Sequence, residues 1–471
     1  MFDELHEECG VFGCYQCQDA ASLTYYGLHS LQHRGQEASG IAVASHGKIQ
    51  VFKGKGLTVD VFSREDLDQL EGDLSVGHVR YSTAGGQEYE NIQPIAAEGY
   101  QGDIALVHNG QIVNDRELRK ELEAAGAIFQ GTSDSEVILH LIEKQTGTLE
   151  ERVKKAAQRL EGAFSILVMK DDTLIAFRDP HGLRPLSYAR NRQGWIISSE
   201  SCAFEVMGIY RHTDVLPGQM VVFKDGLPRS SFYTPKRDHH LCAMEYIYFA
   251  RPDSVIEDKN VHALRKETGR LLARQDKGLQ ADVVIGCPDS SLSAAMGYAE
   301  EADLPFQYGL VKNRFVTRTF IQPTQAMRDR GVRMKLSPVR EVIDGRRVVL
   351  IDDSIVRGTT SRRIVNLLRE AGAKEVHVRS SAPPFINPCY YGTDIDSKDK
   401  LIACKYSVPE IREIINADSL GYLSINSLGM LIGAKPGEGF CQACFTGEYP
   451  TKVPNADIKN KYEQKIGKIN E

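Results

Sequence analysis

The segment Val348–Ser361, VVLIDDSIVRGTTS, constrains the fold more than any other part of the sequence. It begins with a continuous apolar run that predicts a buried strand, and a polar loop then leads into the amphipathic helix SRRIVNLLREAGA. The run ADVVIGCPDSSLSAAMGYAEEA has the same order of strand, polar turn and helix, and VHVRSSAPP adds a further strand. Strands that alternate with helices predict right-handed βαβ units and a parallel sheet. We therefore expect a parallel α/β domain in the second half of the chain.

The loop after the first of these strands has the composition of a phosphate site. The strand delivers Asp352 and Asp353 to its carboxyl end, where ligands bind in open parallel sheets. Gly358 permits close approach of the backbone, and the hydroxyls of Thr359 and Thr360 together with helix N-terminal amides can surround a phosphate. The adjacent carboxylates can hold sugar hydroxyls or Mg²⁺ beside it. The alternative is an ordinary capped helix after an acidic turn.

This segment resembles the signature of the type I phosphoribosyltransferases, and the resemblance implies that phosphoribosyl pyrophosphate and Mg²⁺ bind here. It also implies that the loop CPDSS holds pyrophosphate with Ser290 near the metal, although a helix N-cap at Ser290 or Ser291 is the alternative. The implied ligands of phosphoribosyl pyrophosphate are Asp352, Asp353, Ser354, Arg357, Gly358, Thr359, Thr360, Asp289, Ser290 and Lys335. The implied Mg²⁺ ligands are Ser290, Asp352 and Asp353.

The basic segment between the two loops contains Lys335, which matches the lysine of the family's lid. Residues 312–340 are dense in Arg and Lys and show no clear periodicity, which is also typical of a solvated loop. The functional interpretation is a mobile lid that closes over pyrophosphate and excludes water.

The first half of the chain has a different pattern. The runs IAVAS, DIALVHNG, AFSILVMK and GWIISSE predict strands, and helices are expected at about 134–144 and 149–159. A length of 471 residues favours two domains, with a boundary in the polar stretch Thr234–His240. We expect a propeptide at 1–8, one domain at 9–235 and a second at 236–471.

Five motifs of the first half belong together. They are ECGVFG at Cys9, LQHRGQEASG, GHVRYSTAGG, LVHNGQIVN and GTSDSE. Together they resemble the class II glutamine amidotransferases, which implies an N-terminal-nucleophile α/β/β/α sandwich. The implied roles are Cys9 as the nucleophile, Asn109 and Gly110 at the oxyanion, Arg80 at the glutamine α-carboxylate and Asp134 at its α-ammonium. Arg34 matches a position near the nucleophile, where a structural role is an equal alternative.

The role of Cys9 requires a change at the N-terminus. A nucleophile needs a base, and the α-amino group of Cys9 can serve because its ordinary pKa of about 7.7–8.0 is close to physiological pH. That amine exists only after cleavage between Glu8 and Cys9, so we expect an eight-residue propeptide. The alternative is an acidic tail that stays attached.

The cysteines allow two metal sites. On spacing alone, the pair Cys441 and Cys444 could join Cys14 and Cys17 in a four-thiolate zinc site. One branch of the phosphoribosyl amidotransferases carries both a propeptide and a [4Fe–4S] cluster, and resemblance to it implies another ligand set. That set is Cys242, Cys389, Cys441 and Cys444. The role of the cluster would be structural.

Taken together, the resemblances imply that glutamine, water and phosphoribosyl pyrophosphate give 5-phosphoribosylamine, glutamate and pyrophosphate, the committed step of purine synthesis, with internal ammonia transfer. They also imply purine nucleotide inhibitors and a homodimer or homotetramer. An amidotransferase with another acceptor lacks the second-half signature; a catalytically silent purine-sensing regulator is the remaining alternative. The net charge of −6 gives no reason to expect nucleic acid or a membrane surface. The acidic N-terminus lacks the features of a secretory signal, which favours a cytoplasmic location.

Overall fold

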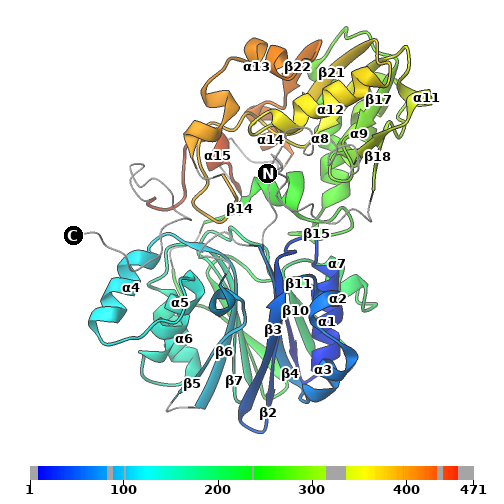
Figure 1. Ribbon diagram of the computed structural model, residues 1–471. Helices are drawn as coiled ribbons and strands as arrows, with labels where there is room; N and C mark the ends of the chain where they lie inside the picture. The colour runs from blue at the N-terminus through cyan, green and yellow to red at the C-terminus, as the bar shows by residue number, and fades with distance from the viewer. Residues whose placement is uncertain are drawn as a thin grey trace.

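The structure is a computed structural model that describes residues 9–81, 88–99, 102–235, 238–313, 336–395, 397–431 and 439–453. The chain forms two bodies stacked one above the other, the first half below and the second half above in Figure 1. The expected propeptide at 1–8 and Lys335 lie outside the described residues.

Two antiparallel sheets form the centre of the first half. The seven-stranded sheet has the order β11 (Thr213–Asp214), β9 (Ser187–Arg190), β10 (Trp195–Ser198), β1 (Gly10–Tyr15), β4 (Leu74–Arg80), β2 (Ala38–Ser45) and β3 (Lys48–Lys55). The six-stranded sheet has the order β13 (Leu227–Phe232), β12 (Gln219–Lys224), β8 (Thr173–Arg178), β7 (Gly162–Lys170), β6 (Gly102–Ile112) and β5 (Ile95–Gly99).

Helices cover the outer face of each sheet. The seven-stranded sheet is covered by α1 (Ala20–Ser30), α2 (Thr58–Val61), α3 (Arg64–Gln69) and α7 (Cys202–Glu205). The six-stranded sheet is covered by α4 (Asp115–Ala124), α5 (Asp134–Glu143) and α6 (Leu149–Ala157).

Strand β6 explains how the layers pack. Ile104 and Leu106 pack against the helices, whereas Ala105 and Val107 pack against the other sheet. This alternation is the two-residue period of a strand that is buried on both faces. The four layers, helix, sheet, sheet and helix, confirm the sandwich expected for the first half.

The second half contains a four-stranded parallel sheet between helices. Its order is β17 (Val283–Gly286), β20 (Arg347–Asp352), β21 (Glu375–Ser380) and β22 (Ser419–Tyr422). One face packs against α8 (Val261–Gln275) and α9 (Leu292–Ala302). The other face packs against α12 (Thr359–Glu370) and α13 (Val408–Ile414). The parallel sheet expected here is confirmed, although α12 begins two residues before the predicted Ser361, because the two threonines form its first turn.

Short elements complete the second half. They are the pairs β14 (His240–Cys242) with β23 (Gly439–Cys441), β15 (Val255–Ile256) with β16 (Lys259–Asn260), and β18 (Leu310–Lys312) with β19 (Leu336–Pro338), and the helices α11 (Arg340–Ile343), α14 (Ile425–Met430) and α15 (Ala443–Thr446). Further helical turns are Tyr89–Asn91, Lys398–Lys400, Ile402–Cys404 and the π-helical Glu245–Phe249. The predicted boundary Thr234–His240 follows β13 and ends at the first residue of β14.

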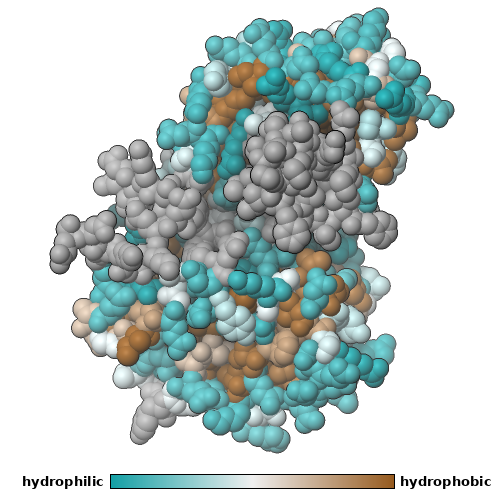
Figure 2. Space-filling model, viewed as in Figure 1, coloured by the Kyte–Doolittle hydropathy of each residue, from teal (hydrophilic) through white to brown (hydrophobic). Residues whose placement is uncertain are grey.

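The visible surface of the second half is mainly hydrophilic, whereas apolar side chains show between the two sheets of the first half (Figure 2). Among the described residues, no helix combines the length and apolar character that crossing a membrane requires.

Candidate active sites

Cys9 lies immediately before β1, beside the end of β4. Gly10 is in register with Val79 of β4, and the Cys9 Sγ donates to the carbonyl O of Tyr81 over 3.3 Å. Nε of Arg34 donates to the Cys9 carbonyl O over 3.1 Å. Only 8% of Cys9 is exposed. The residue predicted to be the nucleophile is therefore buried and held through its backbone and its thiol.

Asn109 lies on β6 of the six-stranded sheet, opposite the sheet that carries Cys9. Val11 and Val107 pack in one core between the sheets. Because side chains alternate along a strand, Cys9 faces the same side of its strand as Val11, and Asn109 the same side as Val107. The structure thus brings the Cys9 thiol and the Asn109 carboxamide to the space between the two sheets.

The Asn109 carboxamide has a further unusual property. The residue is 1% exposed, and its Nδ2 has no hydrogen-bond partner among the described residues. A buried donor without a partner costs roughly 1–3 kcal/mol. At the next position, Gly110 has φ +133°, and a Cβ there would lie 2.2 Å from the Ala163 carbonyl O. Position 110 therefore requires glycine, and the donor beside it is available to a bound molecule.

Arg80 and Asp134 lie close to this centre. Burial lowers the pKa of Arg80, while the neighbouring Cys9 and Asp134 are among the groups that raise it. Asp134 is the first residue of α5, and its Oδ2 accepts a hydrogen bond from the backbone N of Ile112 at 3.2 Å. Helix α5 thus sets the carboxylate against the end of β6, which carries Asn109. The structure brings together four of the six residues predicted for the glutamine site, namely Cys9, Asn109, Arg80 and Asp134.

A buried ion network joins this region to the second half of the chain. Nη2 and Nη1 of Arg34 lie 2.8 and 2.9 Å from the two carboxylate oxygens of Glu245, and Nη1 of Arg184 lies 3.4 Å from the same carboxylate. Arg34 also pairs with Glu200, and all four side chains are at most 1% exposed. Glu245 belongs to the second half, whereas its partners belong to the first.

Glu200 of the first half also binds the second half of the chain. Its Oε2 accepts hydrogen bonds from the backbone N of Arg251 at 3.0 Å and from Oγ of Ser254 at 2.7 Å. Burial raises the pKa of Glu200, but the charges of His33 and Arg34 outweigh burial and hold it well below its usual value. Glu200 is therefore a buried anion with partners in both halves. Beyond Arg34, no local pattern in the sequence indicates this network.

Ser290, Asp353 and Ser354, which are predicted to bind phosphoribosyl pyrophosphate, meet where β17 and β20 end side by side. The Ser290 Oγ donates to the Asp353 carboxylate, whose other oxygen accepts from the Ser354 Oγ at 2.8 Å. Asp352 and Asp353 are 7% and 9% exposed. Lys312 Nζ lies 3.6 Å from the Asp289 carboxylate. The parallel pairing of the two strands brings the two loops together.

The loop before α12 has the form expected for a phosphate cradle. Gly358 caps the helix with φ +80°, and a Cβ there would lie 2.6 Å from Cδ1 of Ile402. Arg357 precedes this glycine and Thr359 follows it as the first residue of α12. The Oγ1 of Thr360 is buried and has no hydrogen-bond partner among the described residues. A buried hydroxyl at a helix N-terminus suits an anion.

Arg265 is a buried arginine near the proposed sites that sequence analysis did not predict. It lies in α8, is 3% exposed and donates to the carbonyl O atoms of Tyr246 and Ala250 over 2.6 and 2.8 Å. Burial lowers its pKa to about 10, while the charges of Asp353 and Glu200 oppose that shift. An arginine in an amphipathic helix is normally solvated, so no local signal in the sequence distinguishes it.

Four cysteines predicted as one ligand set lie near one another in the second half of the chain. Cys242 and Cys441 are in register across the parallel pair β14 and β23. Burial raises the pKa of Cys444 well above its usual value, and the neighbouring Cys242, Cys389 and Cys441 raise it further. The residues of this set therefore lie close together, although they come from three distant segments.

The spacing of these thiols does not fit a zinc ion. Zinc–sulfur bonds of about 2.3 Å in a tetrahedron place sulfurs about 3.8 Å apart. No three of the four sulfurs lie within 4.8 Å of one another. Cys14 and Cys17 belong to a different core under α1, so the zinc set that pairs them with Cys441 and Cys444 is not assembled. Four thiolates are a donor set that iron–sulfur clusters also take.

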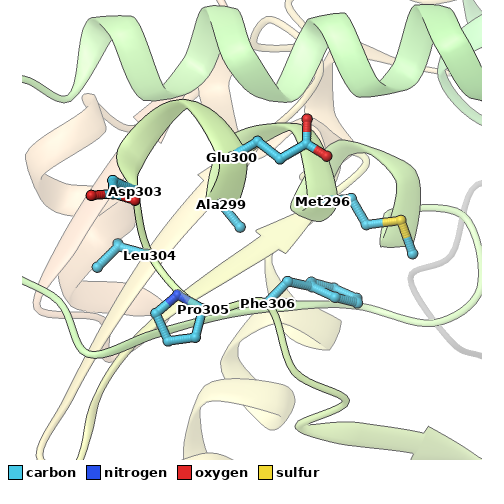
Figure 3. Close-up of a pocket in the computed structure, with 7 residues that line it drawn as sticks. All are labelled: Met296, Ala299, Glu300, Asp303, Leu304, Pro305 and Phe306. Carbon is cyan, nitrogen blue, oxygen red and sulfur yellow. The ribbon is translucent and has the colours of Figure 1, made fainter.

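A pocket of about 520 Å³ on the second half is a separate feature (Figure 3). It lies between the C-terminal half of α9 and the segment that follows this helix, with Met296 and Phe306 approaching each other at one end. Ser290 precedes the opposite end of α9. The pocket is therefore remote from the residues predicted to bind substrate.

Known proteins resemble both halves of the chain. The glutamine amidotransferase domain matches residues 78–206, and the phosphoribosyl transferase domain matches residues 259–410. Amidophosphoribosyltransferase of Bacillus subtilis (strain 168) is 50% identical over 455 residues, which are 95% of each chain. Amidophosphoribosyltransferase of Staphylococcus aureus (strain MRSA252) is 46% identical over 98% of this chain and 94% of its own.

Two solved structures are similar over nearly the whole chain. Glutamine phosphoribosylpyrophosphate amidotransferase from B. subtilis, complexed with ADP and GMP, has a TM-score of 0.89 and 48% identity, covering 95% of this chain and 98% of its own. A structure of the allosteric regulatory enzyme of purine biosynthesis has a TM-score of 0.90 and 50% identity, covering 95% and 97%. These relatives are enzymes, which favours the enzyme over the silent regulator. The chain belongs to the amidophosphoribosyltransferase family, the enzymes of the first step of purine biosynthesis.

Proposed function

We propose that this chain forms 5-phosphoribosylamine in two coupled sites, one that releases ammonia from glutamine and one that adds it to phosphoribosyl pyrophosphate. The observation that carries the proposal is the buried, unpartnered Nδ2 of Asn109, which faces the same space between the sheets as Cys9. A hydrogen-bond donor waiting beside a thiol is what an acyl-transfer reaction needs, because charge develops on the carbonyl oxygen after attack.

In the glutamine site, we assign Cys9 as the nucleophile and its α-amino group as the base, after removal of residues 1–8. The Asn109 Nδ2 and the Gly110 amide stabilise the oxyanion. Arg80 binds the α-carboxylate and Asp134 the α-ammonium of glutamine, an assignment supported by their opposite charges and their burial beside Cys9. Arg34 positions the nucleophile through its hydrogen bond to the Cys9 carbonyl.

In the second site, Asp352 and Asp353 hold the ribose hydroxyls, and the loop before α12 holds the 5′-phosphate. We assign the phosphate to Ser354, Arg357, Gly358, Thr359 and Thr360, and the pyrophosphate to Asp289, Ser290 and Lys335. The buried Oγ1 of Thr360 supports the phosphate assignment. Lys335 rests on resemblance alone.

Oxygen donors gathered at the ends of β17 and β20 suit Mg²⁺, which prefers carboxylate and hydroxyl oxygens. Ser290, Asp352 and Asp353 would hold the ion. When bound, Mg²⁺ supplies charge that stabilises the leaving pyrophosphate. The protein side chains orient the ribose so that C1 faces the incoming ammonia and exclude competing water.

Ammonia passes internally from one site to the other. Released ammonia would be protonated at pH 7 and would lose its nucleophilic lone pair. The buried ion network between the two halves supports direct transfer, because it fixes the glutamine site against the second half. We assign residues 9–235 to the glutaminase domain and 236–471 to the transferase domain.

We also propose that Cys242, Cys389, Cys441 and Cys444 hold a structural [4Fe–4S] cluster. The support is the proximity of four cysteines, because thiolates are the protein ligands of iron–sulfur clusters. When bound, the cluster would keep the thiols ionised and join three distant segments. A cluster held by reduced thiolates belongs in a reducing compartment, so we propose a cytoplasmic location.

Regulation is proposed by analogy with a relative. The B. subtilis structure is complexed with ADP and GMP. We propose that purine nucleotides inhibit this chain as well, and that it assembles as a homodimer or homotetramer.

The test uses anaerobically purified full-length protein with Mg²⁺ and phosphoribosyl pyrophosphate. With glutamine, the wild-type chain should release glutamate and pyrophosphate in equal amounts, and intact mass should show a chain that starts at Cys9. Cys9→Ala should abolish both products with glutamine and retain pyrophosphate release with added ammonia. Neither product from a correctly processed wild-type chain would overturn the proposal.

A further inference from the structure

The segment that crosses from the first half to the second runs beside the loop that follows β8. The backbone N of Asp238 donates to the Pro180 O over 3.2 Å, and the N of His240 donates to the His181 O over 2.7 Å. Two residues later, the N of Cys242 donates to the Leu183 O over 3.1 Å. The crossing segment and residues 180–183 therefore form a short ladder of backbone hydrogen bonds.

This ladder gathers two imidazoles around one carboxylate. One Asp238 oxygen bonds Nδ1 of His181, and the other lies 3.1 Å from Nε2 of His240. One donor atom from each of the three side chains lies within 4.8 Å of the other two. It is the one such group of three among the described residues.

The site is rigid on one side and open on the other. The Asp179 carboxylate accepts hydrogen bonds from the backbone N of His181 at 2.9 Å and of Leu183 at 3.1 Å, which fixes the loop that presents His181. The side chains of His181, His240 and Asp238 are 11%, 21% and 54% exposed. An ion from solvent can reach the open side, and the exposed carboxylate can rotate to admit it.

Two imidazole nitrogens and one carboxylate are the donors that zinc and similar divalent transition ions prefer, at bond lengths of about 2.0–2.2 Å. We propose that His181, Asp238 and His240 bind one divalent ion of the zinc class, with solvent completing its coordination. The alternative is a trio held by hydrogen bonds alone. The backbone ladder favours the ion. It holds the segment of His181 beside the segment that carries both Asp238 and His240, so the three side chains meet without depending on contacts among themselves.

The ion fastens the crossing segment to the first half. His240 and Cys242 share a side of β14, and Asp238 precedes this strand by two residues. Cys242 is in register with Cys441, so the fastened segment leads directly into β14 and its pairing with β23. The ion is distinct from Mg²⁺ and from the proposed cluster, because its ligands are imidazoles and a carboxylate from other residues.

The test is calorimetric titration of full-length, anaerobically purified protein with ZnCl₂, and cobalt absorption as a report of ligand type. The wild-type chain should bind one zinc ion at this site, and Co²⁺ there should show a spectrum without thiolate charge-transfer bands. His181→Gln and His240→Gln should each weaken binding by at least tenfold, since even supporting residues around a metal can matter that much. His239→Gln is the matched control, because His239 is adjacent but pairs with Glu257, and it should bind zinc as the wild type does.

A second measurement protects the conclusion from a folding defect. Zinc should raise the unfolding temperature of the wild type and of His239→Gln with increasing concentration, and this rise should disappear in Asp238→Asn, an exposed and isosteric change. No zinc binding by the wild type would overturn the proposal. Equal binding by all variants, or thiolate bands with cobalt, would overturn it as well, because the ion would then lie on cysteines or elsewhere.

Discussion

Individual residues around the proposed glutamine site are buried with incomplete hydrogen bonding. Asn109 leaves its Nδ2 without a partner, and His78 leaves its Nδ1 without one, among the described residues. Buried polar atoms are normally satisfied, and exceptions in native proteins call for a reason. For Asn109 the proposed reason is that a substrate oxygen accepts from Nδ2. For His78, burial keeps the imidazole neutral and Nε2 donates to the His108 O, so Nδ1 carries no hydrogen that needs an acceptor.

Asn109→Ala is expected to lower glutamine-dependent activity by about two to three orders of magnitude, because one oxyanion donor contributes roughly that much. Stability should stay the same or rise, since the change removes an unsatisfied buried donor. Ammonia-dependent synthesis should be retained. Steady-state assays with each nitrogen source check this, and unchanged glutaminase activity would contradict the assignment.

His78 should make stability depend on pH. Burial, helped by the charges of Arg80 and His108, lowers its pKa to about 3, and its Nε2 donates to the His108 O over 3.2 Å. Between about pH 3 and the ordinary value near 6.5, the unfolded chain binds a proton that the native chain does not. His78 therefore makes stability rise with pH in that window, by up to about 1.4 kcal/mol per pH unit, and lowers stability as pH falls.

His78→Gln should flatten that dependence between pH 5 and 6.5. Urea unfolding followed by fluorescence measures it, because the single tryptophan, Trp195, lies on β10 in the same sheet as His78. Identical slopes in the two proteins would show that native and unfolded His78 bind the proton equally in this range, and would contradict the lowered pKa.

At the scale of elements, both proposed sites lie where strands end. Parallel pairing of β17 with β20 sets Ser290 against Asp353, and β1 beside β4 sets Cys9 against Tyr81. The helix that follows a strand supplies the next group, as α12 does with Thr360. A site built in this way depends on register, because a shift of one residue turns a side chain to the other face of the sheet.

Thr360→Val should raise the KM for phosphoribosyl pyrophosphate by about ten- to a hundredfold, because a hydrogen bond to a charged group is worth about 1.5–3 kcal/mol. The unfolding temperature should not fall, since the Oγ1 has no partner to lose among the described residues. Hydrolysis of glutamine at the first site should persist when it is assayed alone. A KM equal to that of the wild type would exclude the threonine from the phosphate site.

At the scale of the whole molecule, the two halves are joined by buried charge. Arg34 contacts the backbone of Cys9 and the carboxylate of Glu245, and Arg184 contacts Glu245 from a second side. Breaking one partner of a buried pair leaves an uncompensated charge, which costs about 3–5 kcal/mol. The network is therefore strong where it is complete and costly where one member is lost.

Glu245→Gln should lower the free energy of unfolding by roughly 3 kcal/mol and lower glutamine-dependent synthesis more than ammonia-dependent synthesis, because Arg34 also holds Cys9. Asp253→Asn is the control: it breaks the partly exposed pair with Arg251 in the same half. Exposed pairs contribute about 0–1 kcal/mol, so the control should change little. Equal loss of both activities in Glu245→Gln would mean that the network stabilises the protein without positioning the nucleophile.

The sequence predicted what is encoded locally. Strand periods, the strand–loop–helix order around Asp352 and the glycine at 358 depend on neighbours in the chain, and the structure has them as expected, apart from the earlier start of α12. Resemblance implied the site residues. The described ones gather in two groups, one around Cys9 and one around Asp353. The zinc pairing of Cys14 and Cys17 with Cys441 and Cys444 was an alternative that spacing alone allowed, and it is not assembled because spacing says nothing of which cores two segments enter.

The sequence by itself determined the two kinds of sheet and the family, and it predicted the residues of the proposed sites, because these follow from periodicity and from motifs whose members are close in the chain. Only the tertiary structure decided which distant charges meet. Glu245 reaches Arg34 across 211 positions, and Asp238 reaches His181 across 57. Nothing in a local pattern distinguishes a glutamate that will be buried between two halves from one that will be solvated. Its partners become visible only when the sheets, the crossing segment and the ladder beside it are in place.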